Sequence, residues 1–128
     1  MIRRLDGVGA VAAGQWDGLA GADNPFLSHA FLSAMEDSGS VGPGTGWQAS
    51  PFVAEDGAGR LTGALPAYLK GHSQGEYVFD HAWADAWQRA GGRYYPKVQI
   101  AAPFTPATGP RVLGADAGVQ VALLRAVE

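Results

Sequence analysis

The chain has 128 residues, with nine lysines and arginines against twelve aspartates and glutamates, and a net charge of −3 at pH 7. This length suits one domain with a buried core, and the charge lacks the basic footprint of a protein that binds duplex nucleic acid. The absence of cysteine excludes disulfides, zinc–cysteine sites and thiol nucleophiles.

The N-terminal region is predicted to be part of the folded domain and not a secretory signal. Asp6, Gln15 and Asp17 interrupt its small apolar residues, and frequent glycines leave no apolar signal core. No stretch of the chain is long and apolar enough to predict a membrane span. We therefore expect a cytoplasmic protein.

The first third of the chain predicts a short strand over residues 1–6, a weak helix over 10–20, and a stronger helix that follows. Asn24 suits the N-cap of the stronger helix, Pro25 suits its first turn, and Gly39 ends it. One apolar face repeats at helical spacing, formed by Leu27, Ala30, Phe31, Ala34 and Met35.

The middle of the chain predicts an antiparallel pair of strands over residues 47–55 and 60–70. The sequence "DGAG" between them is a hairpin signal. Pro51 and Pro66 argue against central strand positions or mark bulges, because proline cannot donate to a strand ladder.

The last third predicts a helix that Asp80 caps and that ends at Gly91 and Gly92, and then a strand over 94–102. A loop over residues 103–111 follows. Asp116 then caps a final helix, whose apolar stripe consists of Val119, Ala122, Leu123, Ala126 and Val127.

This order of elements indicates a mixed α/β fold of the α+β type, and not a doubly wound sheet. The final amphipathic helix needs a partner for its apolar face, for which a following strand is the natural candidate. We therefore expect the chain to be the front part of a longer protein.

The loop before the last helix is a candidate anion site. Thr105, Thr108, Gly109 and Arg111 supply hydroxyls, a close backbone approach and a positive charge, and helix starts favour phosphate. Neither a Walker pattern nor a GxGxxG motif is present. The alternative interpretation is a connection that its prolines make rigid.

Three residues at the start of the third helix form a candidate acid–base group. His81 and Asp85 lie four residues apart, hence on one helix face, and Asp80 precedes them. A carboxylate can orient a histidine that acts as a general base. The alternative is a capping Asp80 beside a surface histidine. One histidine with two acids leaves a metal site incomplete, so no metal is expected.

Aromatic residues are concentrated between positions 77 and 104. Trp83 and Trp87 are spaced as core residues of a helix, although such rings can also stack on a base or line a pocket. Lys70 and Lys97 could meet phosphates, but isolated lysines on strands are usually solvated.

Three long segments resemble the FemAB-like branch of the GNAT acyltransferase superfamily. They read "NPFLSHAFLSAMEDSGSVGPGTGW", "LPAYLKGHSQGEYVFDHAWADAW" and "GGRYYPKVQIAAPFTPATGPR", and together they extend from about Asn24 to Arg111. Bacterial members of this group are described as N-acyltransferases linked to peptidoglycan biosynthesis.

The resemblance implies a GNAT-like, mainly antiparallel sheet flanked by helices. Residues 1–128 would then be the first GNAT-like half of a longer two-half protein, incomplete at the C-terminus. By position, "KVQIAA" and the loop 103–111 correspond to the strand and loop that hold acyl-CoA in GNAT enzymes, before the helix 116–127. The usual Arg/Gln-x-x-Gly-x-Gly/Ala signature is absent.

The activity that the resemblance implies is transfer of an acyl or aminoacyl group to an amine. The donor would be acetyl-CoA or another acyl-CoA, or an aminoacyl-tRNA, and the acceptor a small molecule or a peptidoglycan precursor. Asp80, His81 and Asp85 would handle the substrate or its proton, and Thr105, Thr108, Gly109 and Arg111 the donor. The alternative is a non-catalytic recognition or structural half, with the chemistry in the C-terminal half.

Overall fold

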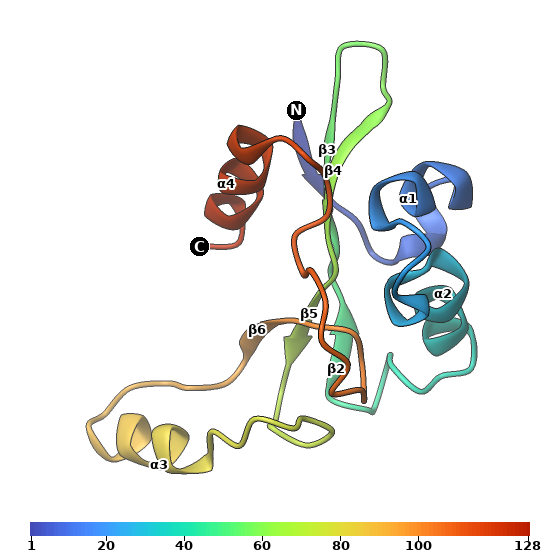
Figure 1. The fold of residues 1–128 in the computed structure, drawn as a ribbon. Coiled ribbons are helices and arrows are strands. Elements are labelled where there is room, and N and C mark those ends of the chain that lie inside the picture. The colour runs from blue at the N-terminus through green and yellow to red at the C-terminus, as the bar shows by residue number, and fades with distance from the viewer.

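The computed structural model describes all residues from 1 to 128 and has a mixed α+β fold, as predicted (Figure 1). Two small antiparallel sheets have the strand orders β1-β3-β4 and β2-β5-β6. The strands are β1 (Ile2–Arg4), β2 (Trp47–Ala49), β3 (Phe52–Glu55), β4 (Leu61–Leu65), β5 (Ala67–Lys70) and β6 (Lys97–Ile100). The helices are α1 (Ala13–Ala20), α2 (His29–Asp37), α3 (His81–Arg89) and α4 (Ala117–Ala126), with 3₁₀ turns at Val8–Ala10 and Pro25–Leu27.

Two prolines divide the predicted hairpin between the two sheets. Pro51 separates β2 from β3 and Pro66 separates β4 from β5, because neither residue can donate a ladder hydrogen bond. Beside the prolines the two chain segments stay paired, since the Ser50 N–H donates to the Ala67 carbonyl at 2.8 Å. One long hairpin therefore supplies the centre of both sheets.

The sheet β1-β3-β4 lies between helices. Figure 1 shows α1 and α2 on one side of it and α4 on the other. Trp16 of α1 is fully buried and donates its indole N–H to the Leu27 carbonyl at 2.9 Å. The core contains Leu5, Val8, Trp16, Leu27, Leu32, Val53, Ala64, Ala102 and Leu113.

The helix predicted to begin at Asn24 is in fact two elements. Asn24 accepts a hydrogen bond from the Phe26 N–H at 3.0 Å and so caps only the 3₁₀ turn. Ser28 caps α2, because its hydroxyl accepts from the Phe31 N–H at 3.1 Å. The predicted cap was wrong because a second capping residue follows within one turn of the first.

The last helix begins as predicted. The Asp116 carboxylate accepts from the Val119 N–H at 2.9 Å. Helix α4 packs closely on β4 because Gly63 has no side chain. A Cβ at Gly63 would lie 2.6 Å from Val119 Cγ1 and 2.9 Å from Leu123 Cδ1.

Residues 71–96, between β5 and β6, form an arm that contains α3 and projects from the body of the molecule (Figure 1). Strand β6 is shorter than the predicted 94–102, because residues 94–96 belong to the arm. None of the helices combines the length and apolarity needed to cross a membrane.

Candidate functional site

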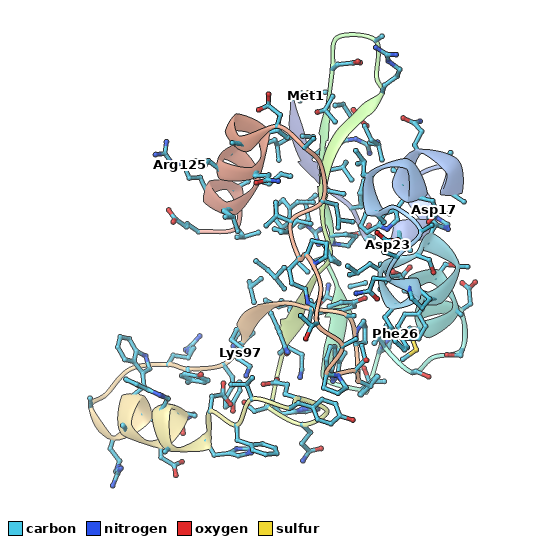
Figure 2. The ribbon with its side chains drawn as sticks, in the orientation of Figure 1. Met1, Asp17, Asp23, Phe26, Lys97 and Arg125 are labelled. Atoms are coloured by element: carbon cyan, nitrogen blue, oxygen red, sulfur yellow. The ribbon has the colours of Figure 1, made fainter.

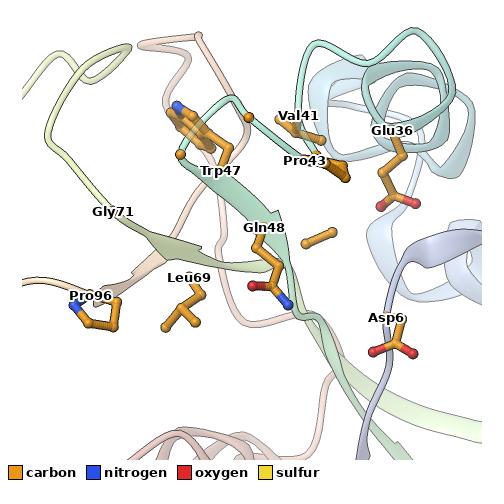
Figure 3. A pocket seen from close by; sticks show the side chains of 13 residues that line it. Asp6, Glu36, Val41, Pro43, Trp47, Gln48, Leu69, Gly71 and Pro96 are labelled. Carbon is orange, nitrogen blue, oxygen red and sulfur yellow. The ribbon is translucent and has the colours of Figure 1, made fainter.

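A cavity of about 640 Å³ opens beside the sheet β2-β5-β6, a size typical of small-molecule sites. Figure 3 shows Leu69 and Pro96 on one side of it, Gln48 at its centre, and the carboxylates of Glu36 and Asp6 on the other side. The remaining lining residues are Val41, Gly42, Pro43, Gly44, Gly46, Trp47, Ala49 and Gly71. The cavity therefore joins an apolar side to an acidic side.

Glycines form one wall of the cavity. Gly42, Gly44 and Gly46 all have positive φ, a conformation that other residues rarely adopt. At Gly46 a Cβ would also lie 2.2 Å from the His72 Nε2 atom, whose ring hydrogen-bonds the Thr45 carbonyl at 2.8 Å. The backbone of this loop therefore borders the cavity directly.

Glu36, in the last turn of α2, brings a half-buried carboxylate to the cavity. Its Oε2 atom accepts a hydrogen bond from the Val8 N–H at 3.1 Å. Burial raises the pKa of Glu36, and the backbone hydrogen bond from Val8 acts in the opposite direction. Gly7 makes room for this carboxylate, since a Cβ there would lie 2.4 Å from Glu36 Oε1.

Ala49 of β2 lines the same cavity, and its backbone polar groups are not used in the ladder with β5. Ser50 and Ala67 form a hydrogen-bonded pair of the β2–β5 ladder. Hydrogen-bonded and non-hydrogen-bonded pairs alternate along an antiparallel ladder, so Ala49 and Tyr68 are a non-hydrogen-bonded pair, and Gln48 and Leu69 are again hydrogen-bonded. The N–H and C=O of Ala49 therefore point away from β5, towards the open edge of β2.

A network of charged side chains joins the arm to the body. Lys97, at the start of β6, lies at this junction (Figure 2). Its ammonium group contacts Glu76 Oε1 at 2.8 Å, Asp80 Oδ2 at 2.5 Å and Ser73 Oγ at 2.9 Å. Burial lowers the pKa of Lys97, but the hydrogen bonds with Asp80 and Glu76 outweigh burial and raise it.

Lys70 is fully buried, so the prediction that it is solvated was wrong. Its ammonium group contacts Glu76 Oε2 at 2.6 Å and the Gln74 carbonyl at 2.9 Å, and lies 3.7 Å from the centre of the Trp47 ring. Burial lowers the pKa of Lys70, against the opposing effect of Glu76. Glu76 thus bridges both lysines.

Asp80 occupies the N-cap position of α3, but its side chain caps nothing, contrary to the prediction. Its carboxylate instead accepts hydrogen bonds from Lys97 and Tyr94. Burial alone would raise the pKa of Asp80, but these bonds and the Lys97 charge lower it well below its usual range. A carboxylate with such a low pKa is a weak base.

His81 and Asp85 both lie on exposed positions of α3. No hydrogen bond joins them to each other, and neither joins the network around Lys97. The role of these two residues with Asp80 in proton transfer stays a prediction.

None of the four residues predicted to hold a donor lines the 640 Å³ cavity. The Arg111 guanidinium donates to the Ala107 carbonyl at 2.6 Å and to the Gly109 and Pro110 carbonyls at 3.2 and 3.3 Å. The Thr108 carbonyl accepts from the Asn24 amide at 3.3 Å, and Thr105 Oγ1 accepts from the Ala107 N–H. Donor binding by Thr105, Thr108, Gly109 and Arg111 also stays a prediction.

Ser73, Lys97 and Tyr95 lie together in an arrangement similar to a serine–lysine pair. The Ser73 hydroxyl is 2.9 Å from Lys97 Nζ and 2.6 Å from the Tyr95 hydroxyl. A serine nucleophile needs a neutral lysine as its base, whereas the two carboxylates keep Lys97 protonated. This group therefore positions the arm and does not activate Ser73.

The sequence did not indicate Glu36 or the cavity. A glutamate beside an aspartate at the end of a helix is common on protein surfaces, and the Val8 N–H that holds Glu36 lies 28 positions earlier in the chain. The glycines of "SVGPGTG" were the available signal, but they predicted only a loop.

The chain was compared with known protein families, curated proteins and solved structures. The model of the FemAB-like family, described as peptidoglycan biosynthesis/recognition, matches residues 7–128. The chain belongs to the FemAB-like family. This membership implies a role in peptidoglycan biosynthesis. Neither a curated protein nor a solved structure matched the chain.

Proposed function

We propose that this FemAB-like chain binds an amine acceptor in the cavity beside Glu36 and takes part in the transfer of an acyl or aminoacyl group to that amine. The observation that carries the proposal is the half-buried carboxylate of Glu36 at the wall of a 640 Å³ cavity. The family supplies the context of peptidoglycan biosynthesis.

An amine must lose a proton before it can attack a carbonyl. Alkyl amines have pKa values of about 10 and are mostly ammonium ions at neutral pH. Glu36 and Asp6 line the same cavity, and Asp6 is paired with Arg4 at 3.2 Å. The negative charge of Glu36 is therefore the one that favours binding of such a cation. Because burial raises the pKa of Glu36, this carboxylate is a stronger base than an exposed glutamate.

In the proposed transfer step, Glu36 takes a proton from the ammonium group, and the nitrogen lone pair attacks the carbonyl carbon of the donor. The C–S bond of an acyl-CoA, or the ester C–O bond of an aminoacyl-tRNA, breaks. The leaving thiolate or alkoxide takes up the second proton that the nitrogen loses as the amide forms. The N–H and C=O of Ala49, which the register turns away from β5, would hydrogen-bond the acceptor.

The donor is the second part of the proposal. In a GNAT-like arrangement, the loop 103–111 would hold acyl-CoA through Thr105, Thr108, Gly109 and Arg111. Arg111 would have to exchange the carbonyls of its own loop for phosphate oxygens. The support for this assignment is the residue types of the loop and its position before α4.

The hydrogen bonds of Arg111 also favour a second candidate function. Its guanidinium already donates to three carbonyls of its own loop. The alternative is a recognition half that binds the acceptor, while a second GNAT-like half binds the donor.

The test is an acyl-transfer assay with an amine-bearing peptidoglycan precursor and either acetyl-CoA or an aminoacyl-tRNA. We expect Glu36→Gln to lower kcat about 100-fold or more, the usual effect of losing a general base. Asp23→Asn is the matched control, since Asp23 is exposed and makes no ion pair. Equal rates for Glu36→Gln and the wild type would contradict the role of Glu36.

Calorimetric titration of acetyl-CoA separates the two candidates. Binding that Arg111→Ala weakens would support a donor site in the loop 103–111. Acceptor binding without acetyl-CoA binding would favour the recognition half or an aminoacyl-tRNA donor.

A further inference from the structure

The arm exposes an unusual number of large apolar side chains. Val78 is 84% exposed, and Phe79 and Trp83 are each 76% exposed. Tyr77 and Trp87 of the same segment are exposed as well. Phe79 stacks on His81, with the ring centroids 6.4 Å apart, while Trp83 and Trp87 are exposed on α3 itself. Large apolar side chains gathered on one exposed segment are typical of an interaction site.

Helix α3 divides into an aromatic and a polar side. Trp83 and Trp87 lie four residues apart and so project from one side. The opposite side, by the same spacing, carries His81, Asp85 and Arg89. A short helix with tryptophans on one side and an arginine on the other has the character of an interfacial membrane helix.

The exposed charge of the arm is positive, although the chain as a whole carries −3. Glu76 and Asp80 are paired with Lys70 and Lys97 and largely buried at the junction. The remaining charged side chains of the arm are then Asp85, Arg89 and Arg93. The two arginines outnumber the aspartate, so the exposed part of the arm carries a net positive charge that complements an anionic surface.

We propose that the arm docks on the surface of an anionic lipid bilayer. Trp83 and Trp87 would enter the headgroup region, where tryptophan is favoured. Arg89 and Arg93 would meet lipid phosphates, which attract basic side chains near an anionic surface. The arm projects from the body (Figure 1), so the bilayer can reach it without contact with the sheets. This inference does not depend on the transfer chemistry.

A second copy of the chain fits this surface less well. A two-fold contact would bring together two copies of a patch in which Arg89 and Arg93 outnumber Asp85, so like charge would face like charge. An anionic bilayer meets both arginines with the opposite charge.

The test uses vesicles of phosphatidylcholine, with or without phosphatidylglycerol, and the full 128-residue chain. We expect binding only to the anionic vesicles, with weakening as salt rises. Trp16 and Trp47 are buried, so a blue shift of tryptophan fluorescence on binding reports on Trp83 and Trp87.

Trp83→Ser removes a ring that packs on little of the protein, and we expect it to weaken vesicle binding about tenfold or more. Val121→Ser is the matched control, since Val121 is 48% exposed on α4, outside the arm. Arg89→Gln with Arg93→Gln should remove the salt dependence.

Three results would overturn the proposal. The first is no binding of the wild type to anionic vesicles, and the second is vesicle binding that Trp83→Ser leaves unchanged. The third is a concentration-dependent dimer that Trp83→Ser dissociates, which would make the arm an interface between copies of the chain. Acyl transfer to a water-soluble acceptor would be the same in Trp83→Ser, so this test is separate from that of Glu36.

Discussion

The two sheets of this chain are stabilised by different interactions. The sheet β1-β3-β4 is packed between helices and has an apolar core in which Trp16 is fully buried. The sheet β2-β5-β6 has a smaller apolar cluster around Trp47, and the arm is attached to it through Lys70 and Lys97 with their carboxylate partners. Apolar burial does not depend on pH, whereas the ionic junction does. The two regions should therefore respond differently to substitution and to acid.

The largest effect is expected in the apolar core. Trp16→Ala should lower the free energy of unfolding by about 3–5 kcal/mol, because it leaves a large cavity and leaves the Leu27 carbonyl without its indole donor. Urea denaturation measures the loss. Trp83→Ala is the control on the arm, where we expect a change within about 0.5 kcal/mol. Equal losses for the two tryptophans would contradict the contrast between core and arm.

At the ionic junction, Lys97→Met should destabilise the chain by about 3–5 kcal/mol. The substitution removes the cation from Glu76 and Asp80 and leaves excess negative charge in a poorly solvated place. Hydrogen exchange should show the opening confined to the arm. Arg60→Met breaks an exposed pair with Asp56 and should cost at most about 1 kcal/mol. Faster exchange throughout β1-β3-β4 would argue against a separate junction.

The junction should also respond to acid. Because the pKa of Asp80 is lowered in the folded chain, its contribution to stability is present above the unfolded value of about 3.9. That contribution is lost as the pH falls through the pKa that Asp80 has in the folded chain. The difference in stability between the wild type and Lys97→Met should therefore shrink in acid, as followed by urea denaturation at several pH values. A difference that stays constant would contradict the ionic explanation.

A smaller effect is expected where α4 meets the sheet. Gly63→Ala should destabilise the chain by about 1–3 kcal/mol, because the new methyl group would overlap Val119 and Leu123. Thermal unfolding measures the change. Gly57→Ala is the matched control, since a Cβ there would meet nothing within 4 Å. A Gly63 variant as stable as the wild type would contradict the close contact of α4.

The smallest effect on stability is expected at Glu36. A raised pKa means that the folded state binds the proton more tightly than the unfolded state, so the stability from Glu36 is present below the unfolded value of about 4.3. This stabilisation is lost as the pH rises through the pKa that Glu36 has in the folded chain. Glu36→Gln should therefore cost no stability at neutral pH, as urea denaturation would show. A large loss would indicate a structural role for the carboxylate.

Local signals in the sequence predicted the order of helices and strands. Asp116 before an apolar stripe was sufficient to place the start of α4, since capping depends on the next three residues. The division of the hairpin was not predicted, although Pro51 and Pro66 were its signal, because their effect depends on how two distant segments pair.

The long-range environment of side chains was not predictable from spacing. The spacing of Trp83 and Trp87 predicted core residues, and this prediction was wrong because both side chains are exposed. The spacing shows that they share a helix side, but not that α3 lies on a projecting arm. The sequence predicted Lys70 as a solvated strand residue. Its burial depends on the ion pair with Glu76 and the contact with the Trp47 ring, which the spacing of residues does not show. The candidate site shows the same limit, because Glu36 acquires its burial and its raised pKa only from distant segments.

The most direct test of the account is the pH dependence of acyl transfer by the wild type and by Glu36→Gln. We predict that the wild-type rate rises with pH as Glu36 loses its proton, at a pH above the ordinary glutamate value of about 4.3, and that Glu36→Gln lacks this rise. The same rising limb in both proteins would contradict Glu36 as the base and, with it, the cavity as the site of the acceptor.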